Sequence, residues 1–312
     1  MKKWLQAFLF VALSAILLAG CSTEAPGSNS DSEGEASDSS EGSAKIGLSI
    51  STLNNPFFVT LKDGAEAEAE KQGIELTVVD AQNDPAKQVS DIEDLIQQGV
   101  DVLLINPADS AAIASAVESA NNAGIPVITV DRSAEGGEVV AHIASDNVAG
   151  GKMAGDFIVE QLGGEGNIVE LEGIPGSSAA RERGEGFHSA VDGVEGLEVV
   201  AKQAADFDRA KGLTTMENII QSSSDIKAVF AHNDEMALGA LQAIEAAGLT
   251  DVLVVGFDAT EDAVKAVEEG RMQATVAQKP TVIGETAVAT AVKLSNGEEV
   301  EAFIPVELEL VK

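Results

Sequence analysis

The sequence predicts an α/β protein of two similar lobes, each a doubly wound parallel sheet with helices on both faces. From Lys45 onward, short β-branched apolar runs alternate with longer helical stretches, which is typical of parallel sheets covered on both sides. The same alternation of strands and helices begins again after Ser145. The whole pattern predicts roughly ten strands, which is too many for one regular parallel sheet but suits two sheets of about five or six strands.

In the first half, glycines and prolines mark the ends of the expected elements. Gly73, Gly99 and Gly124 each follow a helical stretch, where a left-handed cap is expected. Pro56 and Pro126 fall where an element begins, a position that proline tolerates. We expect strands over 45–51, 74–80, 102–106 and 127–131, with helices over 56–72, 86–98 and 110–123.

The second half continues the alternation to the end of the chain. The carboxyl ends of parallel strands form the usual ligand edge of such folds, so we expect a ligand there in both lobes. The expected strands are 168–172, 197–203, 228–231, 252–257, 273–278 and 305–310, and the expected helices are 147–161, 179–191, 209–221, 235–247, 263–269 and 282–294.

The first 44 residues predict an export signal and a tether. An apolar run over 5–18 follows two lysines and is shorter than the ~20 residues of a spanning helix. It ends in Leu-Ala-Gly-Cys21, which resembles the lipobox of bacterial lipoproteins and implies a lipid on that cysteine; an ordinary signal peptide with an incidental cysteine is the alternative. We expect a signal peptide over 1–20, a disordered acidic tether over 21–44, and an exported protein held on the outer face of the cell membrane by its lipid alone.

The charge of the chain excludes one class of partner. The 312 residues carry 52 Asp and Glu against 19 Lys and Arg, a net charge of −33. Nucleic acid binding depends on clustered basic residues, so we expect no nucleic acid partner. The apolar fraction of 45% is that of a globular protein, so the acidity does not indicate disorder throughout.

Polar and aromatic side chains follow most of the expected strands. Carboxylates accept hydrogen bonds from hydroxyls, guanidinium and amide groups donate them, and phenylalanine faces pack on the C–H faces of a sugar ring. The mixture therefore predicts a site for a neutral polyol, although Asp and Asn also cap helices and Phe near a strand end is often core. The clusters lie at 54–58, 131–132, 181–183, 206–209, 232–235, 257–258 and 278.

Long segments of the sequence resemble the ribose-binding proteins of bacterial ABC importers, which have the periplasmic-binding-protein type I fold. The resemblance covers essentially all of 45–312. It is carried by STLNNPFF (51–58), LINP (104–107), PVITVDR (126–132), HIASDN (142–147), SAARERGEGF (178–187), ADFDR (205–209), NDEMALGA (233–240) and VVGFD (254–258).

The resemblance implies a site and a mechanism. Two lobes would close over one pyranose sugar, with D-ribose favoured over allose or xylose, and the closed form would dock as a monomer on an ABC permease. Phe57 and Phe58 would stack on one face of the ring and Phe207 on the other. Hydrogen bonds to the sugar would come from Asn55, Asp131, Arg132, Arg183, Asn233, Asp258 and Gln278.

The same resemblance places three hinge crossings near 145–146, 278–279 and 305–308. The N-terminal lobe would then comprise 45–145 plus 279–307. The C-terminal lobe would comprise 146–278 plus 308–312.

The sequence offers less support for two other functional classes, a DNA-binding repressor and an enzyme. A repressor with this fold needs an N-terminal DNA-binding headpiece, where this chain has the export signal. An enzyme could use Asp131 and Asp258 as a glycosidase pair, but sugar recognition explains both without chemistry. The chain has no phosphate or dinucleotide loop, and its three histidines lack metal-site spacing, so we expect neither catalysis, cofactor nor metal.

Overall fold

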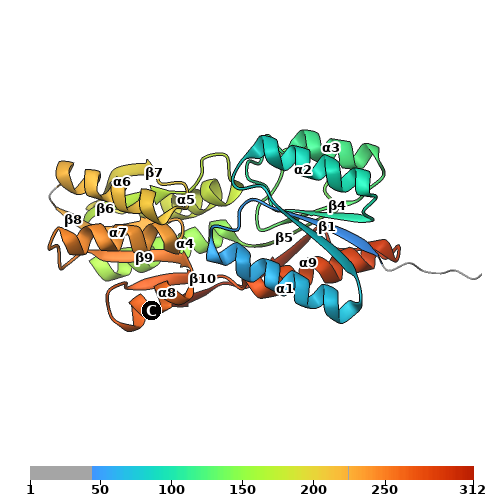
Figure 1. Ribbon diagram of the computed structural model, residues 1–312. Helices are drawn as coiled ribbons and strands as arrows, with labels where there is room; N and C mark the ends of the chain where they lie inside the picture. Colours follow the sequence, from blue (N-terminus) through green and yellow to red (C-terminus); the bar gives the residue numbers. More distant parts are fainter. Residues whose placement is uncertain (1–43, 224) are drawn as a thin grey trace, which may run out of the picture. The chain divides into compact units, whose positions relative to one another are not determined.

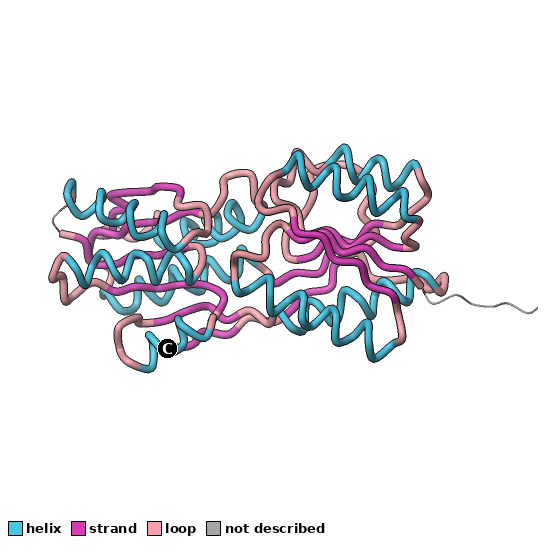
Figure 2. Tube along the Cα trace, viewed as in Figure 1, coloured by secondary structure: helices cyan, strands magenta, loops and turns pink. Residues whose placement is uncertain are grey.

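The computed structural model describes residues 44–223 and 225–312, which form nine helices and twelve strands in two six-stranded sheets (Figures 1 and 2). The first sheet has the order β11 (Phe303–Val306), β5 (Ala141–Ser145), β4 (Val127–Val130), β3 (Val102–Ile105), β1 (Lys45–Ile50) and β2 (Glu75–Asp80). The second has the order β12 (Glu309–Val311), β10 (Ala274–Ala277), β9 (Leu253–Asp258), β8 (Ile226–Ala231), β6 (Gly166–Glu172) and β7 (Leu197–Ala204).

The first sheet is parallel throughout and is covered on both faces. Helices α1 (Pro56–Gln72) and α9 (Pro280–Ser295) share one core with strands β1, β4 and β5. Helices α2 (Pro85–Gln98) and α3 (Ala114–Asn122) form a second core on residues of the sheet that include Leu103. This double covering explains the continuous apolar runs of the strands.

The second sheet is also mainly parallel and covered by helices on both faces. Its strands are parallel except β12, which pairs antiparallel with β10. Helices α4 (Asn147–Leu162) and α5 (Ser178–Val191) share one core with the sheet. Helices α6 (Arg209–Ser222), α7 (Asp234–Ala246) and α8 (Glu261–Glu268) share the core on the other face.

The chain passes between the two sheets three times. It leaves the first sheet between β5 and α4, returns between β10 and α9, and leaves again between β11 and β12 (Figure 1). The predicted fold class, two doubly wound lobes joined by three crossings, is therefore confirmed.

Helix ends follow the local signals of the sequence. Asn55 Oδ1 accepts from the Phe57 N–H at 2.9 Å, with Pro56 in the first helical position of α1. Gly73 and Gly99 take left-handed conformations after α1 and α2, with φ of 69° and 72°. The expected capping glycines at these two helix ends are therefore confirmed.

Three expectations about elements were wrong. Strand β5 was not expected, because AHIAS has few β-branched residues. Helix α3 begins at Ala114 rather than 110, because the Asp109 carboxylate accepts from the backbone N–H groups of Ala111 and Ala112 in a turn. The expected strand over 305–310 is two strands, β11 and β12, one in each sheet.

Some expectations concern residues that the structure does not describe. The predicted signal peptide, Cys21 and nearly all of the predicted tether fall within 1–43 and lie outside the described residues. Among residues 44–223 and 225–312, no helix is both long and apolar enough to cross a bilayer.

Candidate functional site

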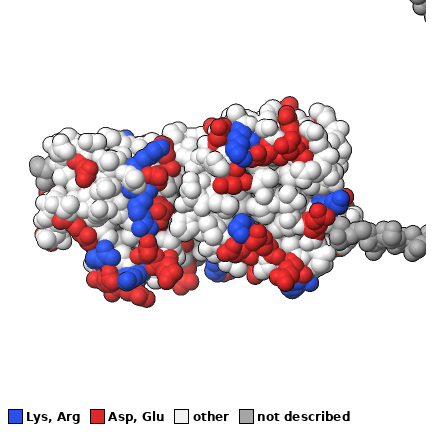
Figure 3. All heavy atoms as spheres, viewed as in Figure 1, with Lys and Arg blue, Asp and Glu red and all other residues white. Residues whose placement is uncertain are grey.

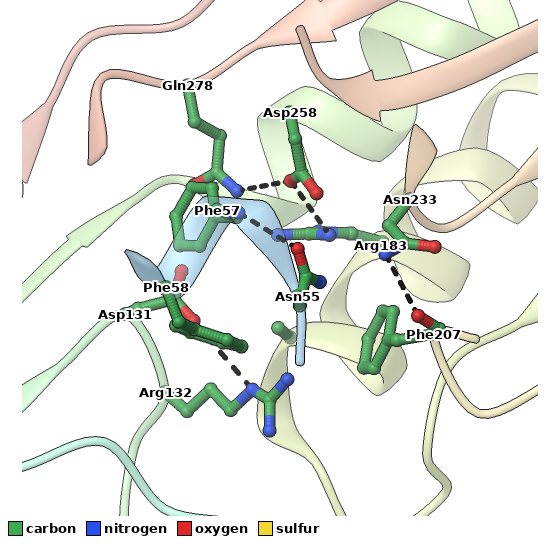
Figure 4. Close-up of a pocket in the computed structure, with 11 residues that line it drawn as sticks. Asn55, Phe57, Phe58, Asp131, Arg132, Arg183, Phe207, Asn233, Asp258 and Gln278 are labelled. Carbon is green, nitrogen blue, oxygen red and sulfur yellow. Dashed lines mark hydrogen bonds and ion pairs between the residues drawn. The ribbon is translucent and has the colours of Figure 1, made fainter. Parts of the chain in front are cut away.

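The ten residues predicted to bind ligand line one pocket, together with Ala179 (Figure 4). The space open to water between them is only about 10 Å³, so the surrounding side chains or lobes would have to move apart to admit a small molecule. The first lobe supplies the start of α1 and the turn after β4, and the second supplies α5 and the ends of β7 to β10. Carboxyl ends of parallel strands meet at one edge of each sheet, which explains why segments far apart in sequence converge here.

Phenylalanines form two walls of the pocket. The rings of Phe57 and Phe58 meet edge to face with centroids 5.2 Å apart. Phe207 comes from the other lobe, and the Arg132 guanidinium lies 5.0 Å from the Phe58 ring centroid and 5.1 Å from that of Phe207. Phe207 also lies over Gly173, where a Cβ atom would come within 2.0 Å of the ring. Glycine at 173 is therefore needed for this aromatic wall.

Arg183 is held in place by protein groups alone. Its Nε donates to Asn147 Oδ1 at 2.9 Å, and a terminal nitrogen donates to the His232 carbonyl at 2.6 Å. Its guanidinium lies 3.8 Å from the centroid of the Phe257 ring, and the Asp258 carboxylate is 3.7 Å away. A donor fixed in this way does not need to be ordered by the ligand, which favours affinity.

Two asparagines serve both the fold and the pocket. Asn55 uses its side-chain oxygen to cap α1, so its Nδ2 group is the part left for a ligand. Asn233 caps α7 through Oδ1 and donates from Nδ2 to the Phe207 carbonyl at 3.3 Å, an interaction drawn in Figure 4. Both asparagines therefore cap helices, as the sequence allowed for Asn residues after strands, and the capping bonds orient their amide groups in the pocket.

Three buried polar atoms of the pocket have no hydrogen-bond partner among the described residues. They are the acceptors Asp131 Oδ1 and Gln278 Oε1 and the donor Arg132 Nε, which lies 3.7 Å from Asp131 Oδ2, beyond hydrogen-bond distance. Each unpaired buried group costs about 1–3 kcal/mol. A ligand that both donates and accepts hydrogen bonds would remove this cost, and hydroxyl groups do both.

The buried charges of the pocket are balanced. Burial raises the pKa of Asp131, an effect opposed by Arg132 and Arg183. Burial also raises the pKa of Asp258 well above its usual value, again opposed by Arg183, and lowers the pKa of Arg132 to about 10. Two carboxyl groups and two guanidinium groups thus face one another, an arrangement that suits a neutral ligand better than an ion.

The lobes also contact each other directly beside the pocket. Ser110 N donates to the Gly176 carbonyl at 2.9 Å, and Ser110 Oγ accepts from Ser178 N at 3.2 Å. Ser133 N donates to Ser178 Oγ at 2.9 Å, and Arg181 pairs with Glu135. These contacts join the two lobes through protein groups alone, so they should stabilise this arrangement of the lobes.

Removing both serine hydroxyls at this contact should weaken ligand binding. The double variant Ser110→Ala/Ser178→Ala loses two hydrogen bonds of about 0.5–1.5 kcal/mol each, which predicts roughly a 5- to 150-fold rise in the ligand Kd. Titration calorimetry measures it, with Ser119→Ala on α3 as a matched control that bonds only within its own helix. A change below about twofold would contradict a role for these contacts in lobe closure.

Several residues of the site were not predicted. Asn147 orients Arg183, and Asn106 donates to Asp131 Oδ2 at 3.3 Å. Ser110 and Ser178 join the lobes. These partners lie far apart along the chain, and no local pattern marks them, although Asn106, Asn147 and Ser178 fall within the segments that carried the resemblance. Within the part of the chain that the structure describes, no cluster of three His, Cys, Asp or Glu could hold a metal ion.

Comparison with known proteins agrees with this architecture. A family described as periplasmic binding protein domain matches residues 46–299. The ribose import binding protein of Bacillus subtilis is 55% identical over 99% of both chains, and that of Haemophilus influenzae is 58% identical over 85% of this chain and 90% of its own. These relatives are named as binding proteins, which confirms the prediction that the chain is not an enzyme.

A solved structure gives the same result. A solute-binding protein of an ABC transporter from Mycobacterium smegmatis, with bound glycerol, superposes with a TM-score of 0.84 at 40% identity, covering 87% of this chain and 94% of its own. Its bound molecule is itself a small polyol. The chain therefore belongs to the periplasmic binding protein family, as a relative of the ribose import binding proteins.

Proposed function

We propose that the protein captures D-ribose, in its pyranose form, outside the cytoplasm and delivers it as a monomer to an ABC permease. The observation that carries the proposal is the set of unpaired buried atoms, two acceptors and one donor, in a pocket walled by phenylalanines. A pentose offers hydroxyl groups for all three atoms and a C–H face for the rings. The ribose-binding relatives support this choice of sugar.

Sugar binding would shift the lobes toward the arrangement seen here. A ligand favours one conformation only through contacts that the other conformation lacks. The pocket draws Asn55, Asp131 and Arg132 from the first lobe and Arg183 and Asp258 from the second, so a sugar between them would bridge both. In the absence of sugar, the unpaired buried atoms would oppose closure.

The role proposed for each pocket side chain is the one that the resemblance implies. Phe57 and Phe58 would pack on one face of the sugar and Phe207 on the other, and the other seven pocket residues would hydrogen-bond its oxygens. The permease would recognise the closed form. Cys21 would carry the lipid that keeps the protein at the outer face of the membrane.

The surface charge is compatible with this role. Figure 3 shows Asp and Glu spread over the visible face, with fewer Lys and Arg among them. Arg132 and Arg183 are each only 3% exposed, so they face the pocket and not the surface. We therefore expect a neutral sugar to bind with little dependence on salt, whereas nucleic acid would meet an acidic surface.

Calorimetry against a panel of monosaccharides tests the proposal. Residues 42–312 form one compact unit and are suitable for it. D-Ribose should bind with a Kd of about 1 µM or below. Xylose should bind more weakly because its inverted hydroxyl leaves a buried polar group unpaired, and allose because its additional hydroxymethyl group would overfill the pocket. No heat with ribose but clear binding of another pentose or hexose would overturn the assignment.

A further inference from the structure

Asp234 is a fully buried carboxylate that does not line the pocket. It is the first residue of α7 and follows Asn233 in the chain. A buried carboxylate without a cation beside it is costly, so its retention calls for hydrogen bonds that compensate. The structure gives it three.

The three hydrogen bonds join Asp234 to strand β10 and to the turn after β9. Its Oδ1 accepts from Thr275 Oγ1 at 2.7 Å, on β10. Its Oδ2 accepts from the Thr260 N–H at 2.7 Å and from Thr260 Oγ1 at 3.1 Å, in the turn after β9. Thr275 Oγ1 in turn accepts from the Ala259 N–H at 3.1 Å. One carboxylate thus organises the backbone of the turn that contains Asp258.

That turn has an unfavourable backbone conformation. Asp258 has a φ of 116° and Ala259 a φ of 55°, both in the left-handed half of conformational space. Such residues cost about 1–3 kcal/mol each and persist only where their surroundings hold them. Strand β9, which leads into the turn, leaves space for the Asp234 carboxylate at Gly256, where a Cβ atom would lie 2.2 Å from Asp234 Oδ1.

We propose that Asp234 is a positioning residue of the ligand site, which acts with Thr275 to hold the strained turn 258–260 so that the Asp258 carboxylate faces the pocket. In that position Asp258 accepts from Gln278 Nε2 at 2.9 Å and lies 3.7 Å from Arg183 (Figure 4). We call the hydrogen bonds that Asp234 and Thr275 make to this turn the brace. Without the brace, residues 258 and 259 would relax toward negative φ and carry the Asp258 carboxylate away from the ligand. This role rests on the proposed sugar binding, and it makes Asp234 the residue that orients the Asp258 carboxylate toward the ligand.

Thr275→Val tests the brace with little change of shape. The substitution removes the hydroxyl that donates to Asp234 and accepts from Ala259, and we expect the Kd for ribose to rise about tenfold or more. Asp234→Asn, which replaces one acceptor oxygen with a donor facing other donors, should act in the same direction. Thr290→Val, at an equally buried threonine on α9, is the matched control and should leave the Kd unchanged.

A double-mutant cycle separates positioning from general destabilisation. If the brace acts through Asp258, Thr275→Val should change the Kd by less than about twofold in an Asp258→Ala background, yet retain its full effect in an Asn55→Ala background. Weak binding in these backgrounds is measured by ligand-observed NMR. An equal effect in both backgrounds, or no effect in the unaltered protein, would overturn the proposal.

Amide hydrogen exchange supplies a readout that needs no sugar. The Ala259 and Thr260 N–H groups should exchange slowly in the unaltered protein and about tenfold faster in Thr275→Val, with the rest of β9 unchanged. If the unaltered protein fails to bind ribose, the sugar assignment fails while this exchange pattern still tests the brace. Unchanged exchange at both amides would contradict the brace whatever the ligand.

Discussion

Arg183→Ala is expected to abolish sugar binding while the protein remains folded. The guanidinium is the best-held donor in the pocket, fixed by Asn147, the His232 carbonyl and the Phe257 ring. Its removal takes away a charged donor and leaves Asp258 without its nearby cation. Removing one partner of a buried charge pair costs about 2–5 kcal/mol, or roughly 30- to 5,000-fold in Kd.

Calorimetry and thermal unfolding measure these two effects separately. The variant should still unfold cooperatively, at a lower temperature because Asn147 Oδ1 and the His232 carbonyl lose their donor. Arg271→Ala is the matched control, since Arg271 pairs only with the surface residues Glu245 and Glu269 among its described neighbours. Ribose affinity that survives within about threefold would show that the pocket is misplaced.

Replacing Asp258 should separate binding from stability. Asp258→Gly and Asp258→Ala both remove the carboxylate beside Arg183 and Gln278, and each should weaken ribose binding by about 100-fold or more. At a φ of 116°, however, glycine is unstrained and alanine is not. The strain of about 1–3 kcal/mol exceeds the extra unfolded-state entropy of glycine, about 0.4–1 kcal/mol. The glycine variant should therefore melt about 2–4 °C above the alanine variant.

The pH dependence of stability reports the same carboxyl group. Because burial raises the pKa of Asp258, the native protein binds more protons than the unfolded chain between that pKa and about 3.9. Its contribution to the free energy of unfolding therefore grows as the pH falls through that range. Both variants lack this contribution, so urea titrations at about pH 7 and about pH 5 should show a larger increase for the unaltered protein. Parallel behaviour of all three proteins would contradict a raised pKa at Asp258.

The sequence predicted most helix ends of the fold because the signals for them are local. Asn55 and Pro56 mark the start of α1, and Gly73 and Gly99 mark helix ends through their own backbone preferences. Strand β5 was missed because pairing with β4 and β11, and not residue propensity, stabilises it. Residue patterning missed the split of the last strand because pairing with different sheets leaves no mark on the short segment 305–310; only the resemblance implied a crossing near 305–308.

The pocket could be outlined from the sequence, but its supporting contacts could not. Asp131 and Phe207 follow strands and Asp258 ends one, and parallel sheets bring strand ends together, so their convergence is a consequence of fold class. The bonds from Arg183 to Asn147 and from Thr275 to Asp234 join residues 36 and 41 positions apart. Such pairings depend on how helices and turns dock, which periodicity does not encode.

A crystal structure of residues 42–312 with D-ribose tests the central claim most directly. A pyranose ring should lie between Phe207 and the pair Phe57 and Phe58, with its hydroxyls bonded to the three atoms that have no hydrogen-bond partner among the described residues: Asp131 Oδ1, Arg132 Nε and Gln278 Oε1. A sugar bound elsewhere, or one that occupies the pocket and leaves those three atoms unpaired, would contradict the account.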